Sequence, residues 1–170
     1  MRIYALILFV LGATLVGAQP ADPLRADGET SVISFRLAGS LKYVSVCENL
    51  SAGNSYIVYR SGLPSRIELE YPKDKSASWR SFEYAFYLRG GGAENAGLDL
   101  NYLTFFNGDW EYVIYEEYFA DTGATNVGIR LVNEKEGKEL DLPALGSSVQ
   151  GSLGPLRDDE RVPKGEIPNY

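Results

Sequence analysis

The chain has 170 residues and a formal net charge of −7, with 23 acidic residues, 16 basic residues, one cysteine and no histidine. The acidic balance disfavours nucleic acid and anionic membrane surfaces as partners and favours a basic one. The absence of histidine excludes Ser/His/Asp and Cys/His catalysis and removes the commonest zinc ligand, and a lone cysteine excludes an intramolecular disulfide.

The first residues, 1–18, have the pattern of a secretory signal peptide. Met1 and Arg2 precede an uncharged apolar run over residues 3–16, and the small residues Gly17 and Ala18 follow it. This run is shorter than the roughly 18 to 20 apolar residues of a membrane-spanning helix. We therefore predict cleavage near Ala18, no membrane span in the mature protein, and a periplasmic or secreted bacterial protein, since small exported animal domains usually carry disulfides.

The rest of the chain predicts a single all-β domain. We expect a flexible Pro/Asp-rich leader at residues 19–30, an antiparallel β domain at residues 31–145 and an extended or mobile tail at residues 146–170. Within the domain, period-two alternation between turn residues predicts about eight or nine strands that form either a meandering barrel or a β-sandwich. The predicted strands cover residues 31–37, 41–48, 55–60, 66–71, 80–89, 98–107, 109–119, 126–133 and 138–142.

The alternation also predicts which side chains face the core. In the strand at residues 66–71, Ile67 and Leu69 are expected to be buried. In the strand at residues 80–89, the buried stripe is expected to comprise Phe82, Tyr84, Phe86 and Leu88. Between two aromatic-rich strands, Asn107-Gly108 predicts a tight hairpin turn, because a type I′ turn needs positive φ at both central residues.

Three consecutive glycines, residues 90–92, raise the question of a ligand-binding loop. No Gly-Lys-Ser/Thr follows them, and the next element reads as a strand, so we interpret the run as a corner between strands rather than a phosphate site. The corner adjoins the most aromatic hairpin, whose exposed tyrosines are suited to protein interfaces and to stacking on sugars. The candidate binding residues are Tyr87, Arg89, Glu94, Asn95 and Tyr115.

Carboxylate chemistry is the remaining catalytic possibility, and it is the least favoured. It requires Glu116 or Asp99 to lie in a pocket opposite a second acid. Glu116 is either a partly buried acid with a raised pKa or, as we prefer, a residue in water at the sheet edge. Cys47 is expected to be buried and inert. No catalytic residue, cofactor or metal site is predicted.

Several segments resemble a group of small exported bacterial proteins of no established function. They are "YVSVC", "YIVYRSGLPSRIELEYP", "SFEYAFYLRGGG", "NAGLDLNYLTFFNGDWEYVIYEEY" and "GSLGPLR", and the likeness covers about residues 41–157. It implies an envelope origin and a β fold but no active site. The segment "SAGNSY", residues 51–56, is also similar to the loop that periplasmic C-type lysozyme inhibitors insert into the lysozyme cleft, although those barrels commonly carry a disulfide that this chain cannot form.

These observations favour a non-catalytic binding protein of the cell envelope. The preferred hypothesis is a protein-binding or inhibitory module with a basic envelope protein as its partner, because the chain is acidic and rich in tyrosine. The alternative is a carbohydrate-binding module, with a glycan stacked on the aromatic side chains.

Overall fold

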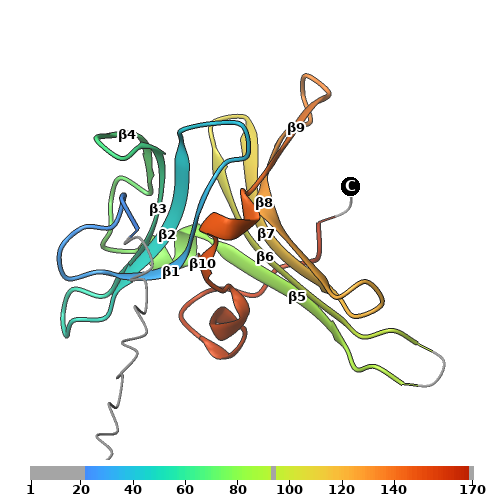
Figure 1. Cartoon of the computed structure of the whole chain (residues 1–170). Helices are drawn as coiled ribbons and strands as arrows, with labels where there is room; N and C mark the ends of the chain where they lie inside the picture. The colour runs from blue at the N-terminus through green and yellow to red at the C-terminus, as the bar shows by residue number, and fades with distance from the viewer. Residues whose placement is uncertain (1–21, 93–94, 169–170) are drawn as a thin grey trace, which may run out of the picture.

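The computed structural model describes residues 22–92 and 95–168. Within these ranges the chain forms ten strands and three short 3-10 helices, which we label η (Figure 1). The elements are β1 (Thr30–Arg36), β2 (Tyr43–Asn49), β3 (Tyr56–Leu63), β4 (Arg66–Tyr71), η1 (Ser78–Ser81), β5 (Glu83–Arg89), β6 (Leu98–Asn107), β7 (Trp110–Phe119), β8 (Ala124–Asn133), β9 (Lys138–Pro143), η2 (Gly146–Ser148), β10 (Gln150–Gly151) and η3 (Gly154–Asp158).

The strands make two antiparallel five-stranded sheets. The first sheet has the order β10-β1-β2-β3-β4, and the second has the order β5-β6-β7-β8-β9. The all-β prediction is confirmed, and of the two predicted architectures the arrangement agrees with the β-sandwich, because the sheets do not close into a barrel. Neighbouring strands in the chain pair with each other inside each sheet, as predicted, whereas β10 returns from the tail to pair with β1.

Local sequence signals placed several elements correctly. A tight hairpin joins β6 to β7 at the predicted place, but its turn is not the predicted type I′ turn on Asn107-Gly108. Asn107 pairs with Trp110, so the central residues are Gly108 and Asp109, and of these only Gly108 has a positive φ, at +65°. The bounds of β4 and β6 are as predicted. β5 starts later than predicted, at Glu83, because Ser78–Ser81 forms η1.

The core lies between the two sheets, and both contribute apolar side chains to it. The first sheet supplies Ile33, Phe35, Val44, Val46, Ile57 and Tyr59; the second supplies Tyr84, Leu103, Phe105, Ile114, Val127 and Ile129; and Trp79, Phe82, Leu153, Leu156 and Val162 pack around them.

Three residues that the alternation assigned to the core are exposed instead. Phe82 and Tyr84 are buried as predicted, but Phe86 is 40% exposed and Leu88 is 56% exposed. The reason is visible in Figure 1, where the far ends of β5 and β6 extend beyond the first sheet, which therefore does not cover them. The guanidinium of Arg157 lies 4.8 Å from the centre of the Phe86 ring and shields it only in part. Ile67 is likewise exposed on the edge strand β4, whereas Leu69 packs against the core. Alternation shows which residues of a strand lie on the same face of the sheet. It does not show whether the opposite sheet extends far enough to cover them.

The predicted flexible leader is wrong for residues 22–29, which pack across the outer face of the first sheet. The buried Asp22 accepts hydrogen bonds from the hydroxyls of Ser31 (2.8 Å) and Ser45 (2.5 Å). Glu29, also buried, forms two bonds to the guanidinium of Arg60, at 2.5 and 2.8 Å. We call residues 22–29 the N-terminal strap. The rest of the predicted leader, residues 19–21, and the predicted signal peptide, residues 1–18, lie outside the described residues.

The predicted extended or mobile tail is also wrong for residues 146–168. Leu153, Leu156 and Val162 are almost fully buried in the core. Farther along, the N–H of Tyr84 on β5 donates to the carbonyl of residue 163 (2.8 Å), and the N–H of residue 165 donates to the carbonyl of Tyr84 (3.0 Å). The tail's apolar residues are too widely spaced to show a period, which is why the sequence pattern missed them.

Candidate functional site

The glycine run is a corner, as interpreted from sequence. Gly90 to Gly92 lead out of β5, and none of the three has a positive φ. The N–H of Gly92 donates to the carbonyl of Asn95 (2.9 Å). Gly91 and Gly97 lie against each other, and a Cβ added to Gly97 would be 3.3 Å from the Gly91 nitrogen. The glycines therefore permit two backbone segments to pass close together between β5 and β6.

The corner ends a sheet face that carries three of the five predicted binding residues. Pairing and alternation place Tyr87, Arg89 and Tyr115 on the side of the second sheet that faces away from the core. We call this side the outer face of the second sheet. It is formed by Glu83, Ala85, Tyr87 and Arg89 on β5, Leu98, Leu100, Tyr102, Thr104 and the 63% exposed Phe106 on β6, Glu111, Val113, Tyr115 and Glu117 on β7, Asn126, Gly128, Arg130 and Val132 on β8, and Glu139, Asp141 and Pro143 on β9.

A small second core lies at the centre of this face. Tyr102 and Tyr115 are opposite each other on β6 and β7, and both are buried together with Ala85 and Val113. The Tyr102 hydroxyl donates to Glu117 (2.9 Å), and the Tyr115 hydroxyl donates to Asp141 (2.9 Å). Burial, followed by the adjacent carboxylates, raises the pKa of both phenols. Both hydroxyls therefore stay protonated at neutral pH and hold the two carboxylates in place.

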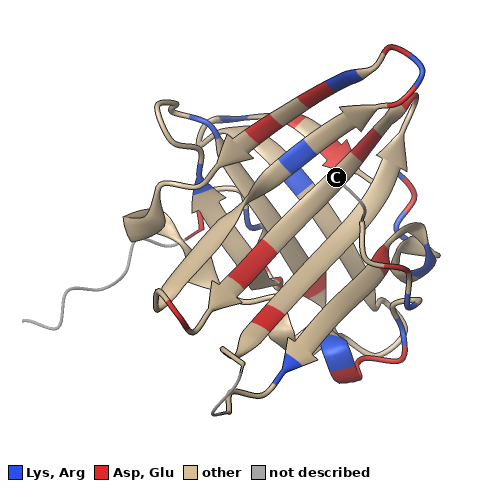
Figure 2. Ribbon diagram, turned by 90° about the vertical axis from the view of Figure 1, so that its right-hand side faces the viewer, with Lys and Arg blue, Asp and Glu red and all other residues tan. Residues whose placement is uncertain are grey.

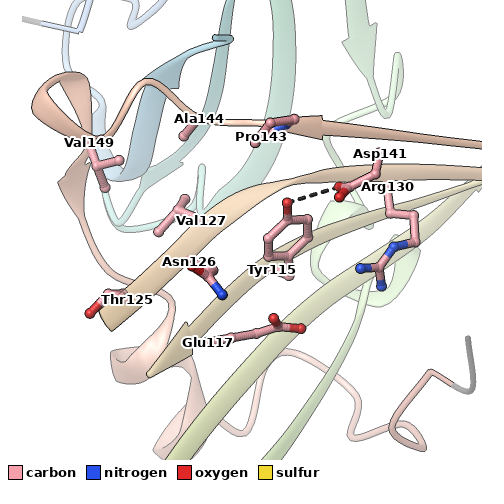
Figure 3. Close-up of a pocket in the computed structure, with 11 residues that line it drawn as sticks. Tyr115, Glu117, Thr125, Asn126, Val127, Arg130, Asp141, Pro143, Ala144 and Val149 are labelled. Atoms are coloured by element: carbon pink, nitrogen blue, oxygen red, sulfur yellow. Dashed lines mark hydrogen bonds between the residues drawn. The ribbon is translucent and has the colours of Figure 1, made fainter. Parts of the chain in front are cut away.

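Of these residues, Tyr115, Glu117 and Asp141 line a surface pocket of about 500 Å³. In Figure 3 the Tyr115 hydroxyl points to Asp141, while Glu117 and Arg130 flank its ring and Asn126 and Thr125 lie along β8. The Arg130 guanidinium carbon is 5.3 Å from the centre of the Tyr115 ring. The pocket thus combines two fixed carboxylates with one guanidinium above a buried tyrosine ring, a set suited to a charged, hydrogen-bonding side chain.

Gly128 makes this geometry possible. It lies opposite Tyr115 in the β7–β8 ladder, between Tyr115 and the β9 strand that carries Asp141. A Cβ at residue 128 would approach the Tyr115 hydroxyl oxygen to 2.3 Å and the Leu142 carbonyl oxygen to 2.9 Å. The Tyr115 side chain therefore crosses β8 over a position that has no side chain, and only in this way does it reach β9.

Acidic residues predominate on the outer face of the second sheet. Its carboxylates are those of Glu83, Glu111, Glu117, Glu139 and Asp141, against the two guanidiniums of Arg89 and Arg130. Figure 2 looks onto this side and shows acidic positions on several of its strands. A second pocket of about 470 Å³ beside the tail adds Glu134 and Glu166 to Glu83 and Glu111 in its lining. The face presents a negative field, which attracts basic partners.

The predicted site residues differ in how exposed their side chains are and in what they contact. Tyr87 is 41% exposed, whereas Tyr115 is only 4% exposed and supports the pocket from below rather than offering a free ring. Arg89 donates from Nε to the Ala96 carbonyl (3.0 Å) and closes the base of the corner. Asn95 is exposed in the corner, and Glu94 lies outside the described residues.

The carboxylates of Glu116 and Asp99, which we considered for catalysis, stabilise the fold by binding the tail. Glu116 accepts hydrogen bonds from the Ser152 hydroxyl (2.8 Å) and from the Leu153 N–H (2.7 Å), which anchors the tail. Asp99 pairs with Arg157 at 2.6 Å. Contrary to our preference, Glu116 therefore does not stand in water at a sheet edge: β7 is an inner strand, and the tail covers the carboxylate.

Cys47 is fully buried, as predicted. Burial raises the pKa of its thiol to about 12, and the nearby carboxylates of Asp22 and Glu29 add to this effect. The loop at residues 51–56 presents exposed small residues, but its tyrosine is turned inward. The hydroxyl of Tyr56 donates to Glu29 (2.8 Å), so its ring lies under the N-terminal strap.

Sequence reasoning missed Glu117, Arg130 and Asp141, which line the pocket, and Tyr102, which lies outside the lining and holds Glu117 by a hydrogen bond. Alternation could have placed Glu117 on the same face as Tyr115, and a glycine inside the strand pattern of residues 126–133 hinted at a close approach. The pairing of Tyr115 with Asp141 depends on strand order and register, which one sequence does not reveal.

Comparisons with known proteins assign this chain to no family. No family model, no curated protein and no solved structure matches the chain. Over residues 22–92 and 95–168, no group of three or more Asp, Glu or Cys side chains is placed to hold a metal ion. Within the same residues, no helix has the length and apolar character needed to cross a membrane.

Proposed function

We propose that this protein is a non-catalytic recognition module of the bacterial cell envelope that binds a basic protein through the outer face of the second sheet. The observation that carries the proposal is the pocket in which Tyr102 and Tyr115 hold Glu117 and Asp141 in fixed positions. Carboxylates held in this way lose little conformational freedom on binding, so they suit a lysine or arginine side chain of the partner.

The surroundings of the pocket favour a protein over a small ligand. The pocket is open to solvent, and the acidic positions continue beyond it to Glu111 and Glu139, farther along β7 and β9, and to Glu83 on β5. A field of this extent speeds the encounter with a basic surface and sets its orientation. Export to the periplasm or the cell surface is part of the proposal and rests on the pattern of residues 1–18.

A glycan is the less favoured ligand. Stacking on sugars needs exposed aromatic faces, and the two central tyrosines of the outer face, Tyr102 and Tyr115, are 6% and 4% exposed. Tyr87 and Phe106 keep exposed rings, but they stand near opposite ends of the face rather than together at its centre. The fixed carboxylates therefore support recognition of positive charge more directly than stacking.

The test is retention of basic envelope proteins on the immobilised mature protein. We expect a partner that binds at about 50 mM salt and elutes at about 500 mM, since surface charge attraction is screened over this range. A Glu117→Gln, Asp141→Asn variant should lose retention at least about tenfold. The matched control is Glu68→Gln, Glu136→Gln, which removes the same charge from exposed positions outside the pocket.

Equal retention by both double variants would contradict the proposal, because net charge alone would then explain the binding. No retained basic protein at low salt would also contradict it. Tyr115→Ala is unsuitable as the first variant, since it removes a buried side chain and so changes folding together with binding.

A further inference from the structure

The pocket on the outer face of the second sheet already holds a cation that belongs to the chain itself. Arg130 lies directly opposite Asp141 in the β8–β9 ladder, and both residues line the pocket. The guanidinium of Arg130 lies over the ring of Tyr115, which is buried beneath it (Figure 3). An aromatic ring below and a carboxylate beside it are the surroundings of a bound arginine side chain.

A second acceptor for Arg130 lies just outside the pocket. Nε of Arg130 is 3.4 Å from a carboxylate oxygen of Glu139, whose side chain is half exposed. Glu139 precedes Asp141 by two residues on the same face of β9, beyond the pocket lining. Arg130 can therefore turn out of the pocket toward solvent and keep an ion pair. This movement would leave the Tyr115 ring and Asp141 open to another cation.

We propose that the partner's anchoring side chain is an arginine and that Arg130 occupies its place in the unbound protein as an intramolecular competitor. The inference rests on the proposed function and adds the ligand and the way it is admitted. Binding is an exchange: the partner's guanidinium takes the position over Tyr115, between Asp141 and Glu117, and Arg130 turns outward to Glu139.

Two physical arguments support this exchange. A planar guanidinium stacks on an aromatic ring and binds carboxylates through paired N–H groups, so the pocket that holds Arg130 fits a second arginine better than a lysine. A competitor inside the pocket also reduces the apparent affinity for a single basic side chain. It thereby favours a partner whose arginine is flanked by further positive charge, which Glu111 and Glu139 attract.

The experiment measures how tightly a fluorescently labelled arginine-rich peptide binds the mature protein, by anisotropy at low salt. We expect Arg130→Gln to tighten binding at least about fivefold, because it vacates the position over Tyr115 and removes a like charge. The matched control is Arg66→Gln, which removes the same charge from an exposed side chain on β4 of the first sheet. The control should tighten binding less than about twofold, since it acts only through the screened field.

Arg130→Lys separates exchange from simple repulsion. This variant keeps the positive charge, but an ammonium group is held less well by the ring and the carboxylates than a guanidinium. Exchange therefore predicts that Arg130→Lys tightens binding at least about twofold, whereas repulsion predicts no change. A lysine-rich peptide of the same length and charge should bind the unmodified protein at least about threefold more weakly than the arginine-rich peptide.

Unchanged or weaker binding by Arg130→Lys overturns the exchange, as does an Arg130→Gln variant that binds no more tightly than Arg66→Gln. Equal affinity for the two peptides overturns arginine as the anchor. The proposed function is tested separately by adding Glu117→Gln and Asp141→Asn to the Arg130→Gln variant. Loss of binding there supports the pocket as the binding site whatever Arg130 does, and unchanged binding overturns the pocket together with the exchange.

Discussion

Replacing Gly128 with alanine places a methyl group where the Tyr115 hydroxyl lies. The new Cβ would be 2.3 Å from the hydroxyl oxygen and 2.5 Å from the ring carbon that bears it. Gly128 does not have a positive φ, so the backbone accepts alanine and the cost is steric. The Tyr115 side chain must move, which breaks its hydrogen bond to Asp141.

The magnitude follows from these contacts. Forcing an extra methyl into a packed position costs about 1–3 kcal/mol, and the lost hydrogen bond costs about 1 kcal/mol. Alanine recovers about 0.4–1 kcal/mol by restricting the unfolded chain. These contributions sum to about 1–3.6 kcal/mol, so we expect Gly128→Ala to lower the free energy of unfolding by about 2 kcal/mol, which lowers Tm by about 4–8 °C for a domain of this size.

A double-mutant cycle in urea measures whether Tyr115 is the cause. In a Tyr115→Ala background the hydroxyl is gone, and of the three nearest atoms to the new methyl group the Leu142 carbonyl oxygen at 2.9 Å remains. The cost of Gly128→Ala should then fall to below about half, which gives a coupling of at least about 1 kcal/mol. Additivity of the two substitutions within about 0.5 kcal/mol would refute the argument that Gly128 exists to let Tyr115 cross β8.

Three further predictions concern parts of the fold outside the pocket. Burial raises the pKa of Glu29, but hydrogen bonds from Arg60, Ala26 and Tyr56 outweigh it and lower that pKa from 4.5 to about 2. The stability from this pair is thus present above pH 4.5 and lost as the pH falls toward 2, so Glu29→Gln should flatten the acid limb of unfolding measured by circular dichroism; an unchanged acid limb would contradict this. Cys47 should resist a thiol reagent in the native protein and react only after denaturation, and fast native labelling would count against its burial. Deletion of residues 152–170 should prevent cooperative unfolding, because it removes buried side chains of the tail, and a truncated chain with an unchanged Tm would refute the packed tail.

The sequence predicted where the strands and turns lie better than it predicted which of their residues are buried. β4, β6 and the hairpin at Gly108 follow from local rules, since alternation and turn chemistry act within a few residues. The exposure of Phe86 and Leu88 could not be predicted, because it depends on where the opposite sheet ends. The same alternation that correctly buried Tyr84 continues past the edge of the core.

The N-terminal strap and the tail were missed for a different reason. Both are rich in residues typical of mobile segments, yet each is held by a few specific long-range contacts. Glu29 finds its partner Arg60 on β3, and Leu153 binds Glu116 on β7 through its N–H. Such contacts depend on tertiary structure, and composition does not record them.

Part of the candidate site followed from the sequence. The aromatic hairpin indicated the correct sheet face, with Tyr87 and Tyr115 on one side. The role of Tyr115 did not follow, since an exposed binding tyrosine and a buried tyrosine that orients Asp141 look alike in one strand. The two roles are distinguished by strand pairing, which places Gly128 of β8 between Tyr115 on β7 and the strand β9 that carries Asp141.

The most direct test of the central claim maps the binding surface itself. A basic probe, an arginine-rich peptide, is titrated into the isotopically labelled mature protein at low salt while the amide resonances are recorded. The account predicts that shifts concentrate on β7, β8 and β9 around Glu117 and Asp141, and that the Glu117→Gln, Asp141→Asn variant abolishes them. Shifts spread evenly over both sheets, or centred on the outer face of the first sheet, would contradict it.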